Sequence, residues 1–127
     1  MNPISIAAIA FVAVLAILAV FQITLAAGAP LGRLAWGGQH RVLPTRNRIA
    51  SLASVAVYAL MALVALDRSG LVDVVPELVA RIAMWVMVGY LVLSIVPNLL
   101  SKSPIERAVM TPISAFLAVL ALVIALG

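Results

Sequence analysis

The chain has 127 residues, of which 66% are hydrophobic and only 9% are charged, and its mean hydropathy is +1.29. A water-soluble domain carries about 25% charged residues, so a soluble fold is excluded and lipid is expected to surround most of the chain. The absence of cysteine and the single histidine exclude disulfides, thiolate chemistry and a multi-histidine metal site within one chain, and we expect no metal and no cofactor. The net charge of +4 favours anionic lipid headgroups over nucleic acid as the partner of the basic loops.

Four apolar runs are each long enough to cross a hydrocarbon core, which takes about 20 helical residues. Only helices and closed barrels span a membrane, and the runs lack the alternation of barrel strands. The sequence therefore predicts an all-α fold, a four-helix transmembrane bundle in a single domain over residues 1–127. The helices are expected at about 3–27, 46–67, 76–100 and 104–126, with an interfacial loop over 28–45. The first run is too long for a cleaved signal sequence and follows no basic residue, so we expect a retained helix.

Local chemistry marks several helix ends. Asn2 and Ser103 each precede a proline, which is the usual order of an N-cap and the first helical residue. Glu106 stands three residues after Ser103 and predicts a capping box. Gly28 and Gly70 lie where a left-handed residue commonly ends a helix.

The basic residues are distributed unevenly between the two ends of the predicted bundle. Six lie in or beside the loops that follow the first and third helices: Arg33, Arg41, Arg46, Arg48, Lys102 and Arg107. The opposite loop and its edges hold Arg68 and Arg81 with three acidic residues, and Glu77 is expected to pair with Arg81 four residues later. The positive-inside rule then puts loops 1–2 and 3–4 in the cytoplasm and both termini outside (N-out/C-out), as a multi-pass protein of a bacterial cytoplasmic (inner) membrane.

Small and polar residues recur along one face of three helices, mostly in the half nearer the arginines, because successive helical residues turn by about 100°. Two interpretations stay open. These side chains form ordinary interhelical hydrogen bonds, or they line a water-accessible cavity or pore that opens to the cytoplasm. The hypothetical lining residues are Ser51, Ser54, Tyr58, Tyr90, Ser94, Asn98, Thr111 and Ser114.

A second set of candidate binding residues lies at the predicted cytoplasmic face: Trp36, His40, Arg41, Arg46, Arg48, Glu106 and Arg107. Trp36 suits the headgroup layer. His40 is either a general base or pH sensor, or simply a solvated interfacial side chain. The arginines are explained by lipid anchoring, with phosphate binding as the alternative. No charged residue stands at a predicted helix centre, which counts against a proton-coupled pump.

Parts of the sequence match a pattern found in a group of membrane proteins. These parts are Gly28-x-Pro30-x-Gly32-x-x-x-Trp36-Gly37-Gly38, then Leu43-Pro44 and Arg48, and later Asn98-x-x-Ser101-x-Ser103-x-x-Glu106-Arg107. The chain thereby resembles uncharacterised small bacterial four-helix integral membrane proteins, over most of its length. The resemblance implies the four-helix fold and no known activity. Small multidrug exporters differ, because their first helix has a buried glutamate, and small fluoride channels differ in their asparagine and phenylalanine pattern.

Three functions stay open at this point. The first is an oligomeric channel or carrier for a small solute, with a polar cavity facing the cytoplasm. Four helices enclose little volume, so a path between protomers and hence a homo-oligomer are expected. The second is an accessory, structural or lipid-binding membrane subunit. The third is a membrane enzyme or ligand-binding protein with a site at the cytoplasmic face, although no residue pattern marks a catalytic centre and we expect a non-enzymatic protein.

Overall fold

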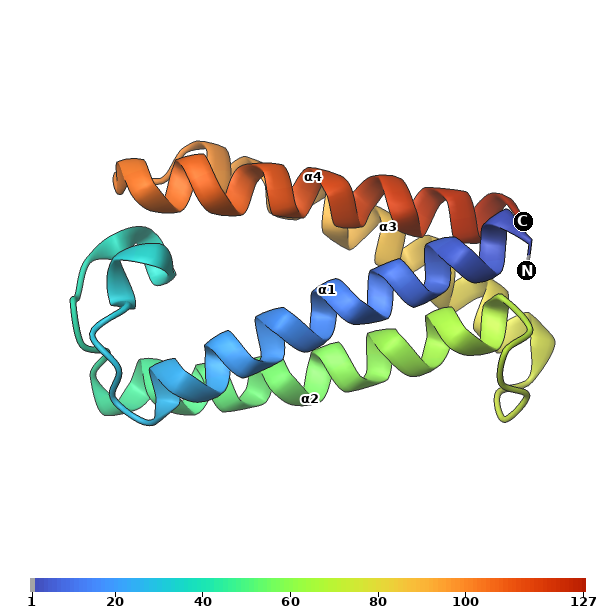
Figure 1. Cartoon of the computed structure of the whole chain (residues 1–127), viewed down its shortest axis with the longest axis horizontal. Coiled ribbons are helices and arrows are strands. Elements are labelled where there is room, and N and C mark those ends of the chain that lie inside the picture. Colours follow the sequence, from blue (N-terminus) through green and yellow to red (C-terminus); the bar gives the residue numbers. More distant parts are fainter. Residues whose placement is uncertain (1) are drawn as a thin grey trace.

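The computed structural model describes residues 2–127, which form four long helices and no strand (Figure 1). The helices are α1 (Pro3–Ala26), α2 (Thr45–Arg68), α3 (Glu77–Leu99) and α4 (Pro104–Leu126). Two short 3-10 turns, η1 (Gly32–Leu34) and η2 (Trp36–Gly38), lie in the loop between α1 and α2. All four helices are long and apolar enough to span a membrane. The predicted all-helical fold of four helices, each long and apolar enough to span a membrane, is confirmed, and each helix end lies within one residue of its predicted position.

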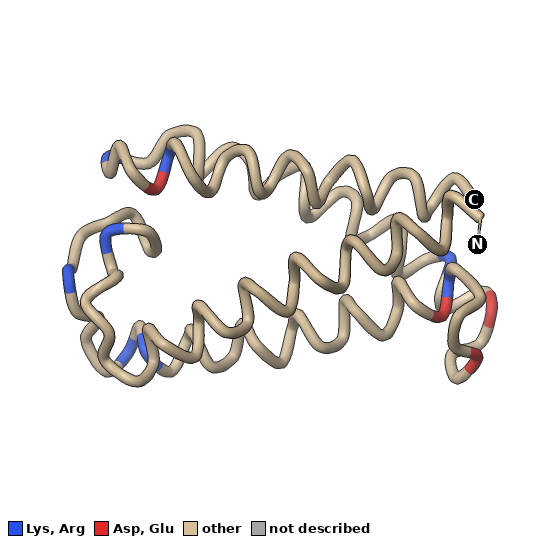
Figure 2. The backbone as a smooth tube through the Cα atoms, in the orientation of Figure 1, with Lys and Arg blue, Asp and Glu red and all other residues tan. Residues whose placement is uncertain are grey.

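The helices form two hairpins that meet side by side. α1 packs along α2, and α3 packs along α4, while narrower contacts of α1 with α4 and of α2 with α3 join the hairpins. The two ends of the described chain and the α2–α3 connection lie at one end of the bundle, here called the terminal end (Figure 1). The α1–α2 loop and the α3–α4 connection lie at the other, the arginine-rich end, where most basic residues gather (Figure 2).

The predicted helix ends are present at both hairpins. The Asn2 side chain accepts a hydrogen bond from the Ser5 N–H at 2.8 Å and caps α1. Gly28 and Gly70 follow α1 and α2 with φ of +99° and +86°, the left-handed conformation that glycine adopts at little cost. These local predictions are confirmed.

The capping box predicted at the start of α4 is wrong in one detail. The Ser103 hydroxyl accepts a bond from the Glu106 N–H at 3.4 Å, as expected. The Ser103 N–H, however, donates to the Ser101 hydroxyl at 3.1 Å and not to Glu106. The Ser101 hydroxyl in turn donates to Glu106 Oε1. The tight α3–α4 connection therefore inserts Ser101 between the two expected partners, so the Glu106 carboxylate is joined to the cap only through the Ser101 hydroxyl.

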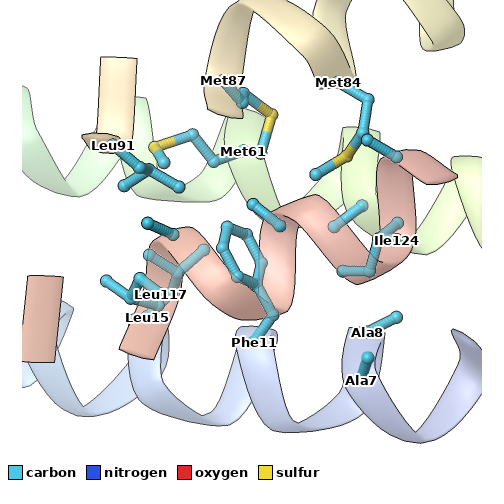
Figure 3. Close-up of a cluster of buried hydrophobic side chains, with 14 of the residues drawn as sticks. Ala7, Ala8, Phe11, Leu15, Met61, Met84, Met87, Leu91, Leu117 and Ile124 are labelled. Carbon is cyan, nitrogen blue, oxygen red and sulfur yellow. The ribbon is translucent and has the colours of Figure 1, made fainter. Parts of the chain in front are cut away.

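A close-packed apolar core fills the half of the bundle nearer the terminal end (Figure 3). All four helices contribute to it, and its largest members include Phe11, Met61, Met84, Met87, Leu117 and Ile124. Unbranched methionine side chains adapt to the irregular space between helices. Large aliphatic side chains also cover the outside of the bundle, as expected where lipid is the solvent.

The surface at the terminal end carries the predicted ion pair. Arg81 Nη2 lies 3.1 Å from Glu77 Oε1, one turn earlier on α3, and both side chains are exposed. The Asp67 carboxylate accepts the backbone N–H groups of Val74 and Val75 at 2.7 Å and so folds the α2–α3 connection. The acidic residues of this end therefore serve loop and helix structure.

Candidate functional site

A cavity of about 340 Å³ lies between the hairpins, in the half of the bundle nearer the arginine-rich end. All four helices and the α1–α2 loop contribute to its wall. Its floor is shared with the packed core through Leu15, Leu18, Met61, Leu91 and Leu117. Close-packed side chains therefore close the cavity toward the terminal end.

Most of the lining residues predicted from the sequence lie in the wall of this cavity. Six of the eight hypothetical lining residues stand in its wall: Ser54, Tyr58, Tyr90, Ser94, Asn98 and Ser114. Ser51 and Thr111 do not line it. Ser51 is fully buried and accepts a hydrogen bond from the loop. The Thr111 hydroxyl is buried without a hydrogen-bond partner among the described residues.

The second predicted set divides between cavity and surface. Trp36 and Glu106 line the cavity, whereas His40, Arg41, Arg46, Arg48 and Arg107 do not. Two of these arginines donate to backbone carbonyls nearby in the chain. Arg48 Nε donates to Leu43 O at 3.0 Å, and Arg107 Nη1 donates to Ser101 O at 2.7 Å. The structure thus does not bring His40 or Arg107 to the cavity wall with Glu106.

One wall of the cavity is fixed by hydrogen bonds between α3 and α4. Asn98 Nδ2 donates to Ser114 Oγ at 2.6 Å and to Ser94 O at 3.1 Å. The Ser94 hydroxyl donates to Leu91 O at 2.7 Å. This wall is therefore polar, but most of its hydrogen-bonding groups bond to other groups of α3 and α4.

Gln22 stands in the opposite wall, on α1, and was missing from the predicted lining residues. Its side chain is only 9% exposed. Nε2 donates weakly to the Tyr58 hydroxyl at 3.5 Å, while Oε1 is buried without a partner among the described residues. A buried acceptor without a donor is unfavourable by about 1–3 kcal/mol. The sequence signal that could have found it is its polar side chain in a largely apolar span, on the same helical face as Leu15 and Leu18.

Glu106 is the single charged residue in the cavity wall, and it is only 5% exposed. Within residues 2–127 the one salt bridge joins Glu77 to Arg81, so no described basic group lies within 4.0 Å of the Glu106 carboxylate. Buried charges in proteins are normally paired. Glu106 therefore combines burial, a cavity and a missing counter-charge.

The α1–α2 loop folds over the arginine-rich end of the cavity. Trp36 Nε1 donates to Ser51 Oγ on α2 at 3.1 Å, and the Ser103 hydroxyl donates to Arg33 O at 2.6 Å. Arg33 Nη1 donates to Gly38 O at 2.6 Å within the loop. Trp36 has φ of +53°, a conformation that costs a bulky residue about 1–2 kcal/mol. The hydrogen bonds from the loop to both hairpins hold Trp36 in this conformation, in which it lines the cavity.

The described residues contain no group of three or more His, Cys, Asp or Glu that could hold a metal ion. Comparison with protein-family models, curated proteins and solved structures finds no match for this chain. No activity, ligand or partner is therefore transferred to it from a relative.

Proposed function

We propose that the chain is a membrane carrier that binds a small, partly apolar solute in the cavity between its hairpins. A mostly apolar pocket with a few convergent polar groups is the usual composition of a small-molecule site. The observation that carries the proposal is the cavity itself, in which Gln22, Tyr58 and Asn98 stand among apolar side chains of all four helices.

The closed floor of the cavity favours a carrier over an open channel through one chain. Leu15, Met61 and Leu117 separate the cavity from the opposite end and belong to the packed core. A solute bound above them cannot continue without a change in how the hairpins meet. A path between protomers of a homo-oligomer, the arrangement expected from the sequence, is the alternative.

The proposed setting is a bacterial inner membrane, with the arginine-rich end in the cytoplasm and both termini outside. The positive-inside rule and the attraction of arginines for anionic headgroups support this orientation. The cavity would then be nearer the cytoplasm. The solute would bind from that side in the conformation described here.

Cysteine accessibility tests the proposal cleanly, because the chain has no cysteine of its own. Ser94→Cys puts a thiol in the cavity wall, and Leu60→Cys puts one on the outer, exposed surface of α2 as a matched control. Each variant is treated with the membrane-impermeant reagent [2-(trimethylammonium)ethyl] methanethiosulfonate, in spheroplasts and in inverted vesicles. Modification is followed by the mass of the intact protein.

A carrier predicts fast modification of Ser94→Cys from the arginine-rich side and slower modification from the other side, with the control unmodified in lipid. Equally fast modification from both sides would show a channel. No modification from either side would contradict the proposal, because the polar wall would then serve packing alone, as in an accessory subunit.

A further inference from the structure

We propose that the solute is an organic ammonium ion, a protonated amine on a small, largely apolar body. This inference rests on the proposed carrier function and names the chemical class that its cavity selects. The geometry supports it through charge, hydrogen-bonding capacity and the aromatic residues of the wall.

The formal charge of the cavity wall is negative, although the whole chain has a formal net charge of +4. None of the eight Lys and Arg residues lines the cavity, and Glu106 is the only Asp or Glu that does. Glu106 is the third residue of α4, where the helix N-terminus favours negative charge. The Ser101 hydroxyl also donates to it. No described basic group lies within 4.0 Å of this side chain.

The hydrogen-bonding groups of the wall also favour a solute that donates hydrogen bonds. The Glu106 carboxylate has only acceptor sites, and the Ser101 hydroxyl donates to one of its oxygens. A carboxylate or phosphate solute would place further acceptors against them. An ammonium group instead supplies a positive charge and N–H donors together.

The remaining lining suits the rest of such a molecule. Aromatic rings attract cations through their faces, and the wall includes Phe21, Trp36, Tyr58 and Tyr90. Apolar side chains such as Leu18, Met110 and Ile113 complete it. A bare metal ion prefers several oxygen ligands, so this mixture of one carboxylate, aromatic rings and aliphatic groups selects an organic cation.

The position of Tyr90 indicates how the solute reaches the cavity. Tyr90 lines the cavity and is also 58% exposed on the outer surface of the bundle. Tyr90 therefore stands between the cavity and the lipid-facing side of α3. A second depression, which contains Arg33 and Lys102, adjoins the cavity at Gly37 and Pro97. An amine with an apolar body partitions into the bilayer interface, and entry beside Tyr90 would keep it away from these two cations.

The test uses the full chain in phosphatidylcholine nanodiscs, with empty nanodiscs as a blank. Of the two tryptophans, Trp36 lines the cavity and Trp85 does not, so Trp85→Phe leaves one fluorescent reporter at the site. The probes are 2-phenylethylammonium, neutral 2-phenylethanol and anionic 3-phenylpropanoate. Equilibrium dialysis of the radiolabelled probes measures the same Kd without the fluorophore.

We expect saturable binding of 2-phenylethylammonium and little binding of the other two probes. Glu106→Gln removes the charge but still accepts the Ser101 bond, and it should weaken binding roughly tenfold or more. Gln22→Leu should weaken binding roughly threefold, because a polar side chain of the cavity wall is lost. Glu77→Gln is the matched control, since it removes an exposed carboxylate at the far end and should leave Kd unchanged.

Equal binding of 2-phenylethanol, tighter binding of 3-phenylpropanoate, displacement of the amine by Na⁺ alone, or an unchanged Kd in Glu106→Gln would each overturn the assignment to ammonium ions. The carrier function would survive these results if Ser94→Cys is still modified from the arginine-rich side. Inaccessibility of Ser94→Cys would instead remove the carrier itself.

Discussion

Gly38 lies where the α1–α2 loop passes close to Ser103, the N-cap of α4. A Cβ atom at this position would lie 2.3 Å from Ser103 Cβ and 2.8 Å from Ser103 Oγ. Its φ of +68° is also unfavourable for any side chain. Ser103 is buried and caps α4, so it cannot move aside without losing that cap.

The effects of three glycine substitutions on the free energy of unfolding should therefore differ with the φ angle and the free space at each glycine. Gly38→Ala combines a clash with a strained φ and should lower the free energy of unfolding by about 2–4 kcal/mol. Gly70→Ala has the strained φ with open space around it, and should cost about 1–2 kcal/mol. Gly89→Ala meets no neighbour and lies within α3, so it should be neutral or stabilising by up to about 1 kcal/mol. Reversible unfolding in mixed micelles measures the three values. A Gly38→Ala protein as stable as Gly70→Ala would contradict the close approach of loop and helix.

At the scale of whole elements, the start of α4 depends on a hydroxyl that also holds the loop. Ser103 Oγ accepts from the Glu106 N–H and donates to Arg33 O. Ser103→Ala should therefore lower the free energy of unfolding by about 1–2 kcal/mol and increase amide hydrogen exchange in residues 32–38. Asn2→Ala is the matched control, because the Asn2 side chain caps α1 and bonds to that helix and not to the loop. It should lower stability without changing exchange in the loop. Equal exchange in both variants would mean that the bond to Arg33 does not order this segment.

The helices themselves could be predicted from the sequence, because their length and their ends depend on local chemistry. A run of about 20 apolar residues specifies a span in lipid, and Asn2, Gly28 and Gly70 mark ends through interactions with their own helix. The Glu77–Arg81 pair is local in the same way. None of these features requires knowledge of a partner helix.

The inward face of α1 could not be predicted in this way. Its buried positions include Ala8, Phe11, Leu15, Leu18, Gln22 and Leu25, at alternating intervals of three and four residues. The outward face carries Ile6, Ile17 and Val20, which are equally apolar. Lipid is as apolar as a protein core, so hydrophobic periodicity does not distinguish the two faces in a membrane. Ser5 and Gln22 are the buried polar residues of α1, and their placement reveals the inner face.

Contacts between segments far apart in the chain were also beyond local prediction. The Trp36–Ser51 and Arg33–Ser103 bonds depend on how the loop folds between the two hairpins. Six of the eight predicted lining residues reach the cavity because helical spacing alone puts them on shared faces. Glu106 joins them for a different reason, since Ser101 replaces it in the cap.

At the scale of the whole molecule, the bundle has one filled half and one hollow half. Phe11, Met84 and Ile124 pack tightly near the terminal end, while the cavity and its polar wall lie near the arginine-rich end. The charged residues are divided between the same two halves. Most basic residues lie at the hollow half, and three of the four acidic residues lie at the filled half (Figure 2). The side of the membrane that the solute reaches first therefore depends on which way this asymmetric molecule is inserted.

The proposed orientation gives a direct prediction for the two ends. Gln39 is exposed in the α1–α2 loop, and Val74 is exposed in the α2–α3 connection at the opposite end. Gln39→Cys and Val74→Cys introduce the only thiol of each variant, since the chain has none. The arginines around Gln39 favour the cytoplasmic side, whereas Asp67, Asp73 and Glu77 nearly balance the cations near Val74. A membrane-impermeant maleimide should therefore label Val74→Cys in intact bacterial cells and Gln39→Cys only after permeabilisation. The opposite pattern would put the cavity nearer the outside, and the solute would then bind from the external medium in this conformation.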